Sequence, residues 1–498
     1  MSIEPSPSHI ELAPSASALV ESLRSIGYSL ESAVADIIDN SITAKAQRVR
    51  VDIGWNKNRA YIRISDDGIG MSRRKLYECM RPGSQSPTEQ RSPDDLGRFG
   101  LGLKTASFSQ CRRLTVTSKC EGFMSSATWD LDHIARSNNW ELILNPCPDS
   151  TRPPMEDWSS GTIVEWDNID KLWHEDSTKE DQQIELNRRV VSIGEHISLT
   201  FHRFIGSKQR QHKLQVYVNG SRLSGFNPFD LSNPATSVDP KEVISYNGKE
   251  ATIQSVTLPH HSKTTNDEWL RNGGRDGYFA NQGFYVYRND RLITHATWFG
   301  LMRKSETVKL CRVMIDIENN GDSDWDIDVM KSRCHPPPVV RKRLRALIER
   351  LCLHSKRVYS RKGARLISKD ALPLWKREKK QGFITYCINQ EHPSIVALRV
   401  SLASDQAALL SSLLSSIADT LPLDQIHGDY SQSPTEFSQQ TASLSDIEIM
   451  IRSSANQLVK QGGLPPSSAL LVLLQSPLFS KHSAMVEDIL RSFQTADD

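Results

Sequence analysis

The sequence lacks the marks of a secreted or membrane protein. Its eight cysteines are scattered without a C-x-x-C pair, which argues against a disulfide framework and a zinc ribbon. The longest apolar run, residues 469–474, is far shorter than the roughly 20 residues that cross a membrane. The first 17 residues are rich in proline and serine and lack a basic segment followed by an apolar one. We therefore expect a cytoplasmic protein with no membrane partner and a flexible N-terminus over residues 1–18.

A strong net charge is also missing, because 61 lysines and arginines nearly balance 59 acidic residues. The charge is uneven, however, since residues 341–380 hold 15 Lys/Arg and 3 Asp/Glu, a local excess of +12. Such a block is either a solvated face or a surface for the phosphate backbone of nucleic acid. The second alternative predicts contacts to double-stranded DNA from Arg341, Lys342, Arg343, Arg345, Lys356, Arg357, Arg361 and Lys362.

Residues 29–41, SLESAVADIIDNS, have the periodicity of an amphipathic helix. Asp36, Asp39 and Asn40 lie at positions i, i+3 and i+4, so they share a face that is separate from the apolar stripe. Acidic groups beside an amide suit a hydrated divalent cation and a water. The alternative is an ordinary polar face directed to solvent.

Two alternating segments, 48–53 and 61–65, predict a β-hairpin around the turn residues WNKNR. The second segment leads into DDGIGM, residues 66–71, so a carboxylate at a strand end precedes a G-x-G. Asp66 would then lie at the floor of a pocket and accept a hydrogen bond from an exocyclic amine. The alternative is a common turn.

Residues 96–107, LGRFGLGLKTAS, combine three glycines with a lysine and a threonine before a segment that can open a helix. Glycines let the backbone approach a ligand closely, and N–H groups at a helix N-terminus favour polyphosphate. The alternative is an ordinary glycine-rich turn. The preceding residues 72–96 lose strong periodicity after Gly83 and predict a mobile lid.

A second block, residues 190–335, has predicted strands at 214–218, 278–287 and 313–317. An amphipathic helix is expected over 340–351. Beyond residue 393 the chain is rich in leucine and serine, with helices expected over 396–421 and 444–495 and a polar linker near 424–443.

Four separated pieces, ESAVADIIDNS, SDDGIGM, GRFGLGLKTAS and GTIVEW, resemble in order the nucleotide-binding motifs of the GHKL ATPases. The resemblance implies an α+β Bergerat fold, a helix layer on a mixed or antiparallel sheet, over residues 19–185. GFYVYRNDRLI and DIDVMKSRCHPP are similar to segments of MORC and MutL ATPases. They imply a ribosomal-protein-like βαβ transducer domain at 186–362, then a basic connector at 363–395 and a helical region at 396–498.

The resemblance implies ATP and Mg²⁺ as ligands. Asn40 would bind Mg²⁺, Asp66 would bind the adenine amino group, and Thr162 would support the base. Lys331 would contact the γ-phosphate, and Asp36 stands where the family has a glutamate that activates water. The other ATP contacts implied are Asp39, Gly68, Gly70, Met71, Gly97, Phe99, Gly100, Leu101, Gly102, Leu103, Lys104 and Thr105.

Aspartate is one methylene shorter than glutamate, so Asp36 predicts slow hydrolysis. Taken with the basic block, the resemblance implies a homodimeric, ATP-driven clamp on DNA of MORC or MutL type. A bacterial restriction-modification or phage-defence setting would fit, with a separately encoded nuclease or helicase as partner. Two alternatives stay open: an ATP-binding switch with little hydrolysis, and a chaperone-type ATPase that acts on protein clients.

Overall fold

The structure, a computed structural model, describes most of the chain in two compact units. The first unit comprises Met1–His260 and Glu268–Ile348, and the second comprises His261–Asp267 and Glu349–Asp498. The domain boundaries expected from the sequence stay predictions. The described residues are 14–56, 59–83, 102–144, 155, 158–173, 176–205, 213–328, 330–331, 333–364, 372–380, 383–423, 425–426, 429 and 442–494.

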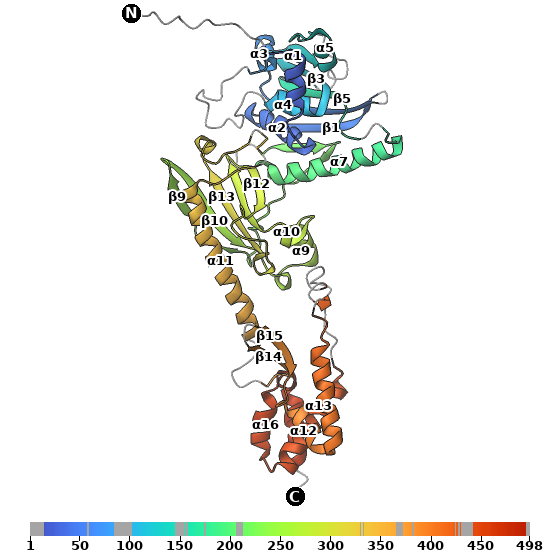
Figure 1. Ribbon diagram of the computed structural model, residues 1–498, viewed down its shortest axis with the longest axis vertical. Coiled ribbons are helices and arrows are strands. Elements are labelled where there is room, and N and C mark those ends of the chain that lie inside the picture. The colour runs from blue at the N-terminus through green and yellow to red at the C-terminus, as the bar shows by residue number, and fades with distance from the viewer. Residues whose placement is uncertain are drawn as a thin grey trace, which may run out of the picture. The chain divides into compact units, whose positions relative to one another are not determined.

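The first sheet has seven strands in the order β4-β3-β5-β2-β1-β6-β7. Figure 1 labels β1, β3 and β5 of this sheet. All neighbours are antiparallel except the parallel pair β1–β6. The predicted hairpin is confirmed, and its register places Val49 opposite Asp66. The strands are β1 (Arg48–Asn56), β2 (Arg59–Asp66), β3 (Cys111–Cys120), β4 (Phe123–Asp130), β5 (Gly161–Ile169), β6 (Gln215–Val218) and β7 (Ser221–Arg222).

Helices α1 (Ala16–Arg24), α2 (Leu30–Thr43) and α4 (Gly102–Gln110) pack against one another and share one apolar core with this sheet. The predicted helix over 29–41 is confirmed as α2. It begins at Ser29, whose hydroxyl accepts a hydrogen bond from the Ser32 backbone N–H at 3.1 Å, a cap typically worth about 1 kcal/mol. The other helices here are α3 (Arg73–Met80), α5 (Leu131–Ser137), α7 (Lys179–Thr200) and α8 (His202–Ile205).

The second sheet of this unit has the strand order β12-β11-β13-β10-β8, with β9 also paired to β10. Its one parallel pair among the described strands is β11–β13. The ribosomal-protein-like class of this domain stays a prediction. Its strands are β8 (Ser237–Val238), β9 (Glu242–Tyr246), β10 (Lys249–Thr257), β11 (Gly283–Arg288), β12 (Arg291–Thr297) and β13 (Cys311–Ile317), with helices α9 (Asn266–Gly273) and α10 (Gly277–Ala280).

The strand predicted over 278–287 is wrong in its first part, where the chain forms α10. Gly277 has φ +74° and turns the chain into this helix. The Tyr278 ring then stacks on Trp269 at 3.9 Å between ring centroids, and its hydroxyl donates to the Trp269 carbonyl. This aromatic contact with α9 outweighs the local preference of the aromatic run for a strand.

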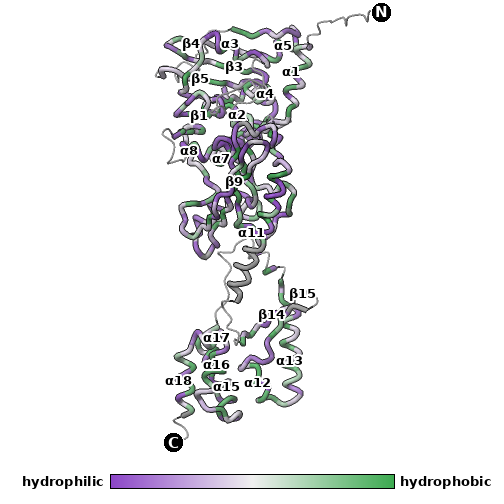
Figure 2. Tube along the Cα trace, turned by 90° about the vertical axis from the view of Figure 1, so that its left-hand side faces the viewer, coloured by the Kyte–Doolittle hydropathy of each residue, from purple (hydrophilic) through white to green (hydrophobic). Residues whose placement is uncertain are grey.

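Helix α11 (Pro338–Ala364) confirms the amphipathic helix expected after the second sheet, with Val340, Leu344 and Leu347 buried. Residues of the second unit then form the hairpin of β14 (Trp375–Lys380) and β15 (Phe383–Ile388), which the sequence analysis did not anticipate. Apolar and polar stretches alternate along the following helices (Figure 2). These are α12 (Pro393–Ser401), α13 (Ser404–Asp419), α15 (Leu444–Asn456), the π-helix η5 (Gln457–Gln461), α16 (Pro466–Leu474), α17 (Pro477–Ser480) and α18 (Ser483–Gln494). In the described part of the chain, no helix combines the length and apolarity that crossing a membrane requires.

Candidate functional site

Four buried charged side chains join α2 to the second sheet. Asp36 and Asp39 come from α2, Arg291 begins β12, and Lys331 follows β13. The Lys331 Nζ lies 2.7 Å from Asp39 Oδ2 and 3.3 Å from Asp36 Oδ1. The Arg291 Nε donates to both Asp39 oxygens, at 2.9 and 2.8 Å. Two acids and two bases compensate one another, which is the condition under which charges tolerate burial.

Asp36 retains an unused acceptor inside this cluster. Its Oδ2 accepts a hydrogen bond from the Tyr28 hydroxyl at 2.8 Å, whereas its buried Oδ1 has no hydrogen-bond partner among the described residues. Burial, helped by the charge of Asp39, raises the pKa of Asp36 against the opposing effect of Lys331 and Arg291. A Cβ added at Gly102 would lie 3.8 Å from Asp36 Oδ2, so α4 begins beside this carboxylate. A carboxylate with a raised pKa suits a general base near neutral pH.

Only part of the predicted polar face of α2 is exposed to solvent. Asp39 is fully buried, so a polar face directed to solvent does not hold at this residue, and its contact with ATP stays a prediction. The reason is tertiary, because Arg291 and Lys331 cover it from the second sheet.

Asn40 is exposed at the end of this face. One amide oxygen fits Mg²⁺ that arrives with a phosphate substrate, because Mg²⁺ keeps several water and phosphate ligands. Within the described ranges, no group of three or more His, Cys, Asp or Glu could hold a metal unaided.

Asp66 ends β2 with its carboxylate held from two sides. Its Oδ1 accepts from the Gly68 backbone N–H at 2.9 Å, and its Oδ2 accepts from the Ser41 hydroxyl at 2.9 Å. Burial raises the pKa of Asp66 to about 6. The sequence analysis missed Ser41, although it follows Asn40 on α2. The carboxylate is oriented by α2 and by the G-x-G turn, as a fixed acceptor for a ligand amine requires.

The raised pKa of Asp66 predicts a pH dependence of adenine-nucleotide binding. The ionised acceptor is present above pH 6 and is lost as pH falls through about 6, so affinity should fall about tenfold between about pH 7 and pH 5. Calorimetric titration with ADP at each pH measures this. The Asp66→Asn variant is the control, because titration of the nucleotide itself affects both proteins. Equal slopes for the two proteins would contradict the assignment.

The turn after Asp66 is packed closely against β3 and β5. Gly70 has φ +66°, and a Cβ there would lie 2.0 Å from the Lys119 carbonyl oxygen. The Met71 N–H donates to the Ser118 hydroxyl at 2.8 Å, and Ser118 Oγ lies 3.0 Å from Thr162 Oγ1. Thr162 is paired with Asp66 across β2 and β5. Ser118, which the sequence analysis also missed, therefore links the turn to Thr162.

Replacing Gly70 with alanine should destabilise the fold by more than about 3 kcal/mol, because the new methyl group meets backbone and φ is left-handed. Gly122→Ala is a matched control, since Gly122 has φ +83° but open space around its Cβ position. The free energy of unfolding of the Gly122→Ala variant should fall by only about 1 kcal/mol. Urea unfolding of both variants measures the difference, and equal losses would show that the contact with Lys119 is unimportant.

The predicted phosphate loop lies only partly within the described residues. Gly97, Phe99, Gly100 and Leu101 fall outside them, as do residues 84–96 of the predicted lid. The helix expected after the glycines is confirmed as α4. In it, Leu103 is half-buried and Thr105 is buried. Lys104 donates to the Cys79 carbonyl at 2.7 Å, and burial lowers the pKa of Lys104 to about 8.

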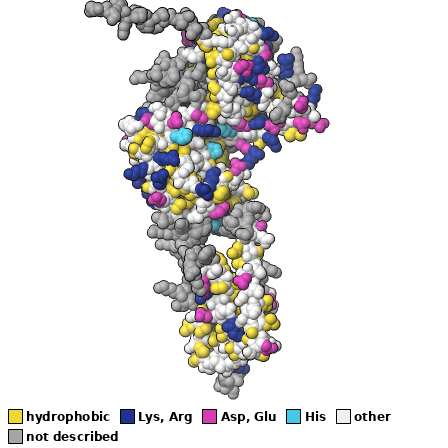
Figure 3. All heavy atoms as spheres, in the orientation of Figure 1, with side chains coloured by type: hydrophobic (Ala, Val, Ile, Leu, Met, Phe, Trp, Pro, Cys, Tyr) yellow, Lys and Arg dark blue, Asp and Glu magenta, His cyan; other side chains and the backbone are white. Residues whose placement is uncertain are grey.

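The predicted DNA contacts on α11 differ in their surroundings. Lys342 and Arg345 are exposed, whereas Arg341 is half-buried. Arg343 is engaged by Glu242 at 2.6 and 3.0 Å. The side chains of Lys356, Arg357, Arg361 and Lys362 lie outside the described part. On the face in Figure 3, basic and acidic side chains are intermixed over the first unit.

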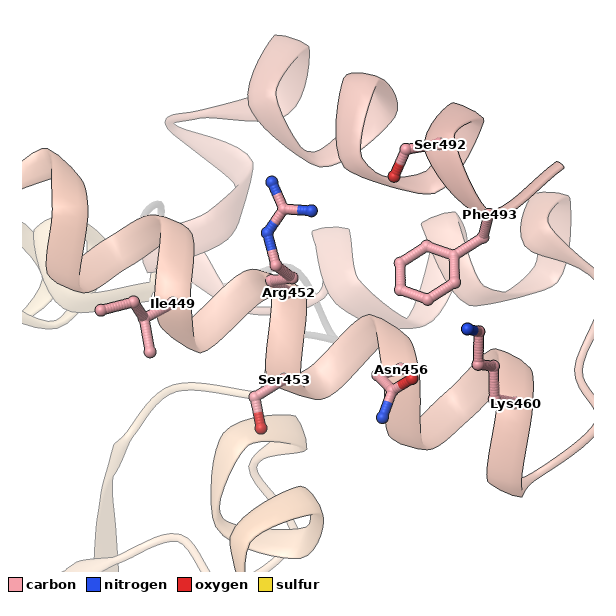
Figure 4. A pocket seen from close by; sticks show the side chains of 7 residues that line it. All are labelled: Ile449, Arg452, Ser453, Asn456, Lys460, Ser492 and Phe493. Carbon is pink, nitrogen blue, oxygen red and sulfur yellow. The ribbon is translucent and has the colours of Figure 1, made fainter. Parts of the chain in front are cut away.

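Two cavities of the described chain differ in the groups that line them. One, of about 190 Å³, is lined by Arg291, Lys331 and His196 among others. Burial lowers the pKa of His196 to about 4, so it adds no charge near neutral pH. The other, of about 550 Å³, lies among α15, η5 and α18 (Figure 4) and has no carboxylate in its lining. Lys460 there lies over the Phe493 ring, at 5.5 Å from its centroid, so this cavity offers no set of groups for acid–base chemistry.

Comparison with protein families concerns the part of the chain that contains α2, β2 and α4. Residues 28–162 match the family described as histidine kinase-, DNA gyrase B-, and HSP90-like ATPase. The ATPase morc-1 of Caenorhabditis elegans is 28% identical over 117 residues, which are 24% of this chain and 13% of that protein. The DNA mismatch repair protein MutL of Actinobacillus succinogenes is 28% identical over 196 residues, 37% of this chain and 28% of that protein.

Among solved structures, the ATPase and transducer domains of DNA topoisomerase II from Balamuthia mandrillaris give a TM-score of 0.37 at 13% identity. The similarity covers 67% of this chain and 86% of that one. A score this low is too weak to decide the fold. The matched relatives are much longer than the segments they share with this chain.

Proposed function

We propose that this chain, a GHKL ATPase with MORC and MutL proteins among its relatives, hydrolyses ATP at a site to which α2, β2 and α4 contribute. The observation that carries the proposal is the buried Asp36 Oδ1, which has no hydrogen-bond partner among the residues that the structure describes and lies 3.3 Å from Lys331 Nζ. A free acceptor beside a cation is what water activation next to a phosphate requires.

In the proposed reaction, Asp66 accepts a hydrogen bond from the adenine amino group and fixes the base. Asp36 takes a proton from the water that attacks the γ-phosphorus, and the bond to the ADP oxygen breaks. Lys331 offsets the negative charge that spreads over the γ-phosphate oxygens. Asn40 would hold Mg²⁺, which neutralises charge on the phosphates.

The raised pKa of Asp36 supports its role as a general base, whereas the short side chain of Asp36 supports slow turnover. Glutamate would extend the carboxylate by one methylene toward a water, and Asp36 is also held by Tyr28 at 2.8 Å. A second candidate function, an ATP-binding switch with little hydrolysis, is favoured by this substitution. A chaperone-like role with protein clients is the remaining alternative.

We further propose that ATP binding drives homodimerisation and that the dimer associates with double-stranded DNA. Exposed Lys342 and Arg345 on α11 and exposed Lys376 and Arg377 on β14 support phosphate contacts within the basic block. A cytoplasmic setting in restriction-modification or phage defence, with a separate nuclease or helicase, is part of this proposal.

One measurement of molecular size tests both the ATP-driven dimerisation and the association with DNA. Light scattering of the full chain with a non-hydrolysable ATP analogue should give a dimer, whereas the nucleotide-free protein should be smaller. Added duplex DNA should bind the dimer, and binding should weaken steeply as salt rises. A monomer in every condition would refute the clamp. A dimer that ignores DNA, in a protein that hydrolyses ATP, would favour protein clients.

A further inference from the structure

Arg291 contacts each of the other three residues of the charged cluster. Its Nε donates to both oxygens of Asp39. Its Nη1 donates to the carbonyl oxygen of Lys331 at 3.3 Å and to that of Leu292 at 3.2 Å. Its Nη2 lies 3.6 Å from Asp36 Oδ1. One guanidinium thus reaches both acids of α2 and the backbone of Lys331.

The backbone around Lys331 has a conformation that needs support. Lys331 has φ +50°, in the left-handed region that non-glycine residues seldom adopt. Holding such a residue costs about 1–3 kcal/mol and persists where neighbouring groups fix it. The Lys331 N–H donates to the Asp328 carbonyl at 3.0 Å, and Arg291 holds the Lys331 carbonyl from the other side.

A tight hairpin turn holds the backbone of Arg291 in place. It pairs with Arg288 across a two-residue turn at Asn289 and Asp290, whose φ values are +47° and +68°. Two left-handed residues in succession define the turn that best fits a tight hairpin. Asp290 is also paired with Arg203 at 3.3 Å. The hairpin therefore fixes Arg291 at the start of β12 before any ligand contact.

We propose that Arg291 is a positioning residue for ATP hydrolysis, which places the Lys331 ammonium beside Asp36 and satisfies the charge of Asp39. Without Arg291, the full charge of Asp39 would draw Lys331 away from the γ-phosphate. This role rests on the proposed ATPase function and adds a residue outside the nucleotide-binding motifs. It also gives the second sheet a direct link to the hydrolysis site.

The test separates positioning from folding. An Arg291→Met variant leaves Asp39 buried beside Lys331 alone, and it should lower kcat about 10- to 100-fold while KM changes less than threefold. A double variant, Arg291→Met with Asp39→Leu, removes both charges at similar volume. Apolar pairs of this kind often restore the stability of a buried ion pair. The double variant should therefore recover the melting temperature but not kcat.

A pH profile gives an independent readout. Because the charge of Arg291 lowers the pKa of Asp36, the acid limb of kcat should move to higher pH in the single Arg291→Met variant. The double variant also loses Asp39, which raises the pKa of Asp36, so no such shift is expected there. A double variant with kcat within twofold of the wild type, together with an unmoved acid limb in Arg291→Met, would show that the pair is only structural. Wild-type protein and Asp36→Asn are run alongside. If the wild type is no more active than Asp36→Asn, the ATPase proposal fails, and the role of Arg291 fails with it.

Discussion

Replacing Asp36 with asparagine is expected to lower kcat for ATP hydrolysis at least about 100-fold while leaving ATP affinity within a few-fold. The side chain keeps its shape but loses the basic oxygen, and a general base typically contributes about 10²–10⁴-fold. The hydrogen bond from Tyr28 to Oδ2 and the contact to Lys331 locate the carboxylate, so the isosteric change tests its basicity rather than its packing. Steady-state phosphate release and equilibrium nucleotide binding measure the two quantities.

The Asp36→Glu variant is the matched control for the length of the side chain that carries the carboxylate. If Asp36 is too short to approach the attacking water well, the added methylene should raise kcat, provided that the buried site accommodates it. If Asp36→Asn hydrolyses ATP as fast as the wild type, Asp36 is not the base. If all three proteins bind ATP and dimerise but none hydrolyses it, the protein is a switch.

Replacing Asp66 with asparagine is expected to weaken ATP binding about 100-fold with little change in kcat at saturating ATP. The amide keeps one acceptor oxygen and turns an –NH₂ group toward one of the two donors that now hold the carboxylate, the Gly68 N–H or the Ser41 hydroxyl. A hydrogen bond to a charged group contributes about 1.5–3 kcal/mol, and a donor facing a donor adds a desolvation cost.

The neighbouring Asp67→Asn variant controls for loss of charge. Asp67 Oδ1 accepts from the backbone N–H groups of Gln47 and Arg48, at 2.8 and 2.7 Å, so it serves the turn and not the pocket. The Asp67→Asn variant should change the free energy of unfolding more than it changes ATP affinity. The adenine assignment is wrong if Asp67→Asn weakens ATP binding as much as Asp66→Asn, or if Asp66→Asn binds like the wild type.

Local sequence sufficed for the elements that bound the candidate pocket. The 3.6-residue periodicity and the Ser29 cap define α2, and alternation around a polar turn defines β1 and β2. The order of four short motifs was enough to indicate a nucleotide-binding fold, and the family match over residues 28–162 covers the first three motifs and the start of the fourth. These are contacts and turns between residues close in the chain, where side-chain chemistry acts directly on the backbone.

Only the tertiary structure decided which acids of α2 are buried and what faces them. Asp39 and Arg291 are 252 positions apart in the chain, and no periodicity relates them. Periodicity gave Asp36, Asp39 and Asn40 one common face, yet the second sheet covers Asp39 and leaves Asn40 exposed. The raised pKa values of Asp36 and Asp66 likewise follow from burial, which is a property of the packed chain. The sequence by itself indicated an ATP-type site, and the fold brought two acids of α2 together with Lys331 and Arg291 as one charged cluster.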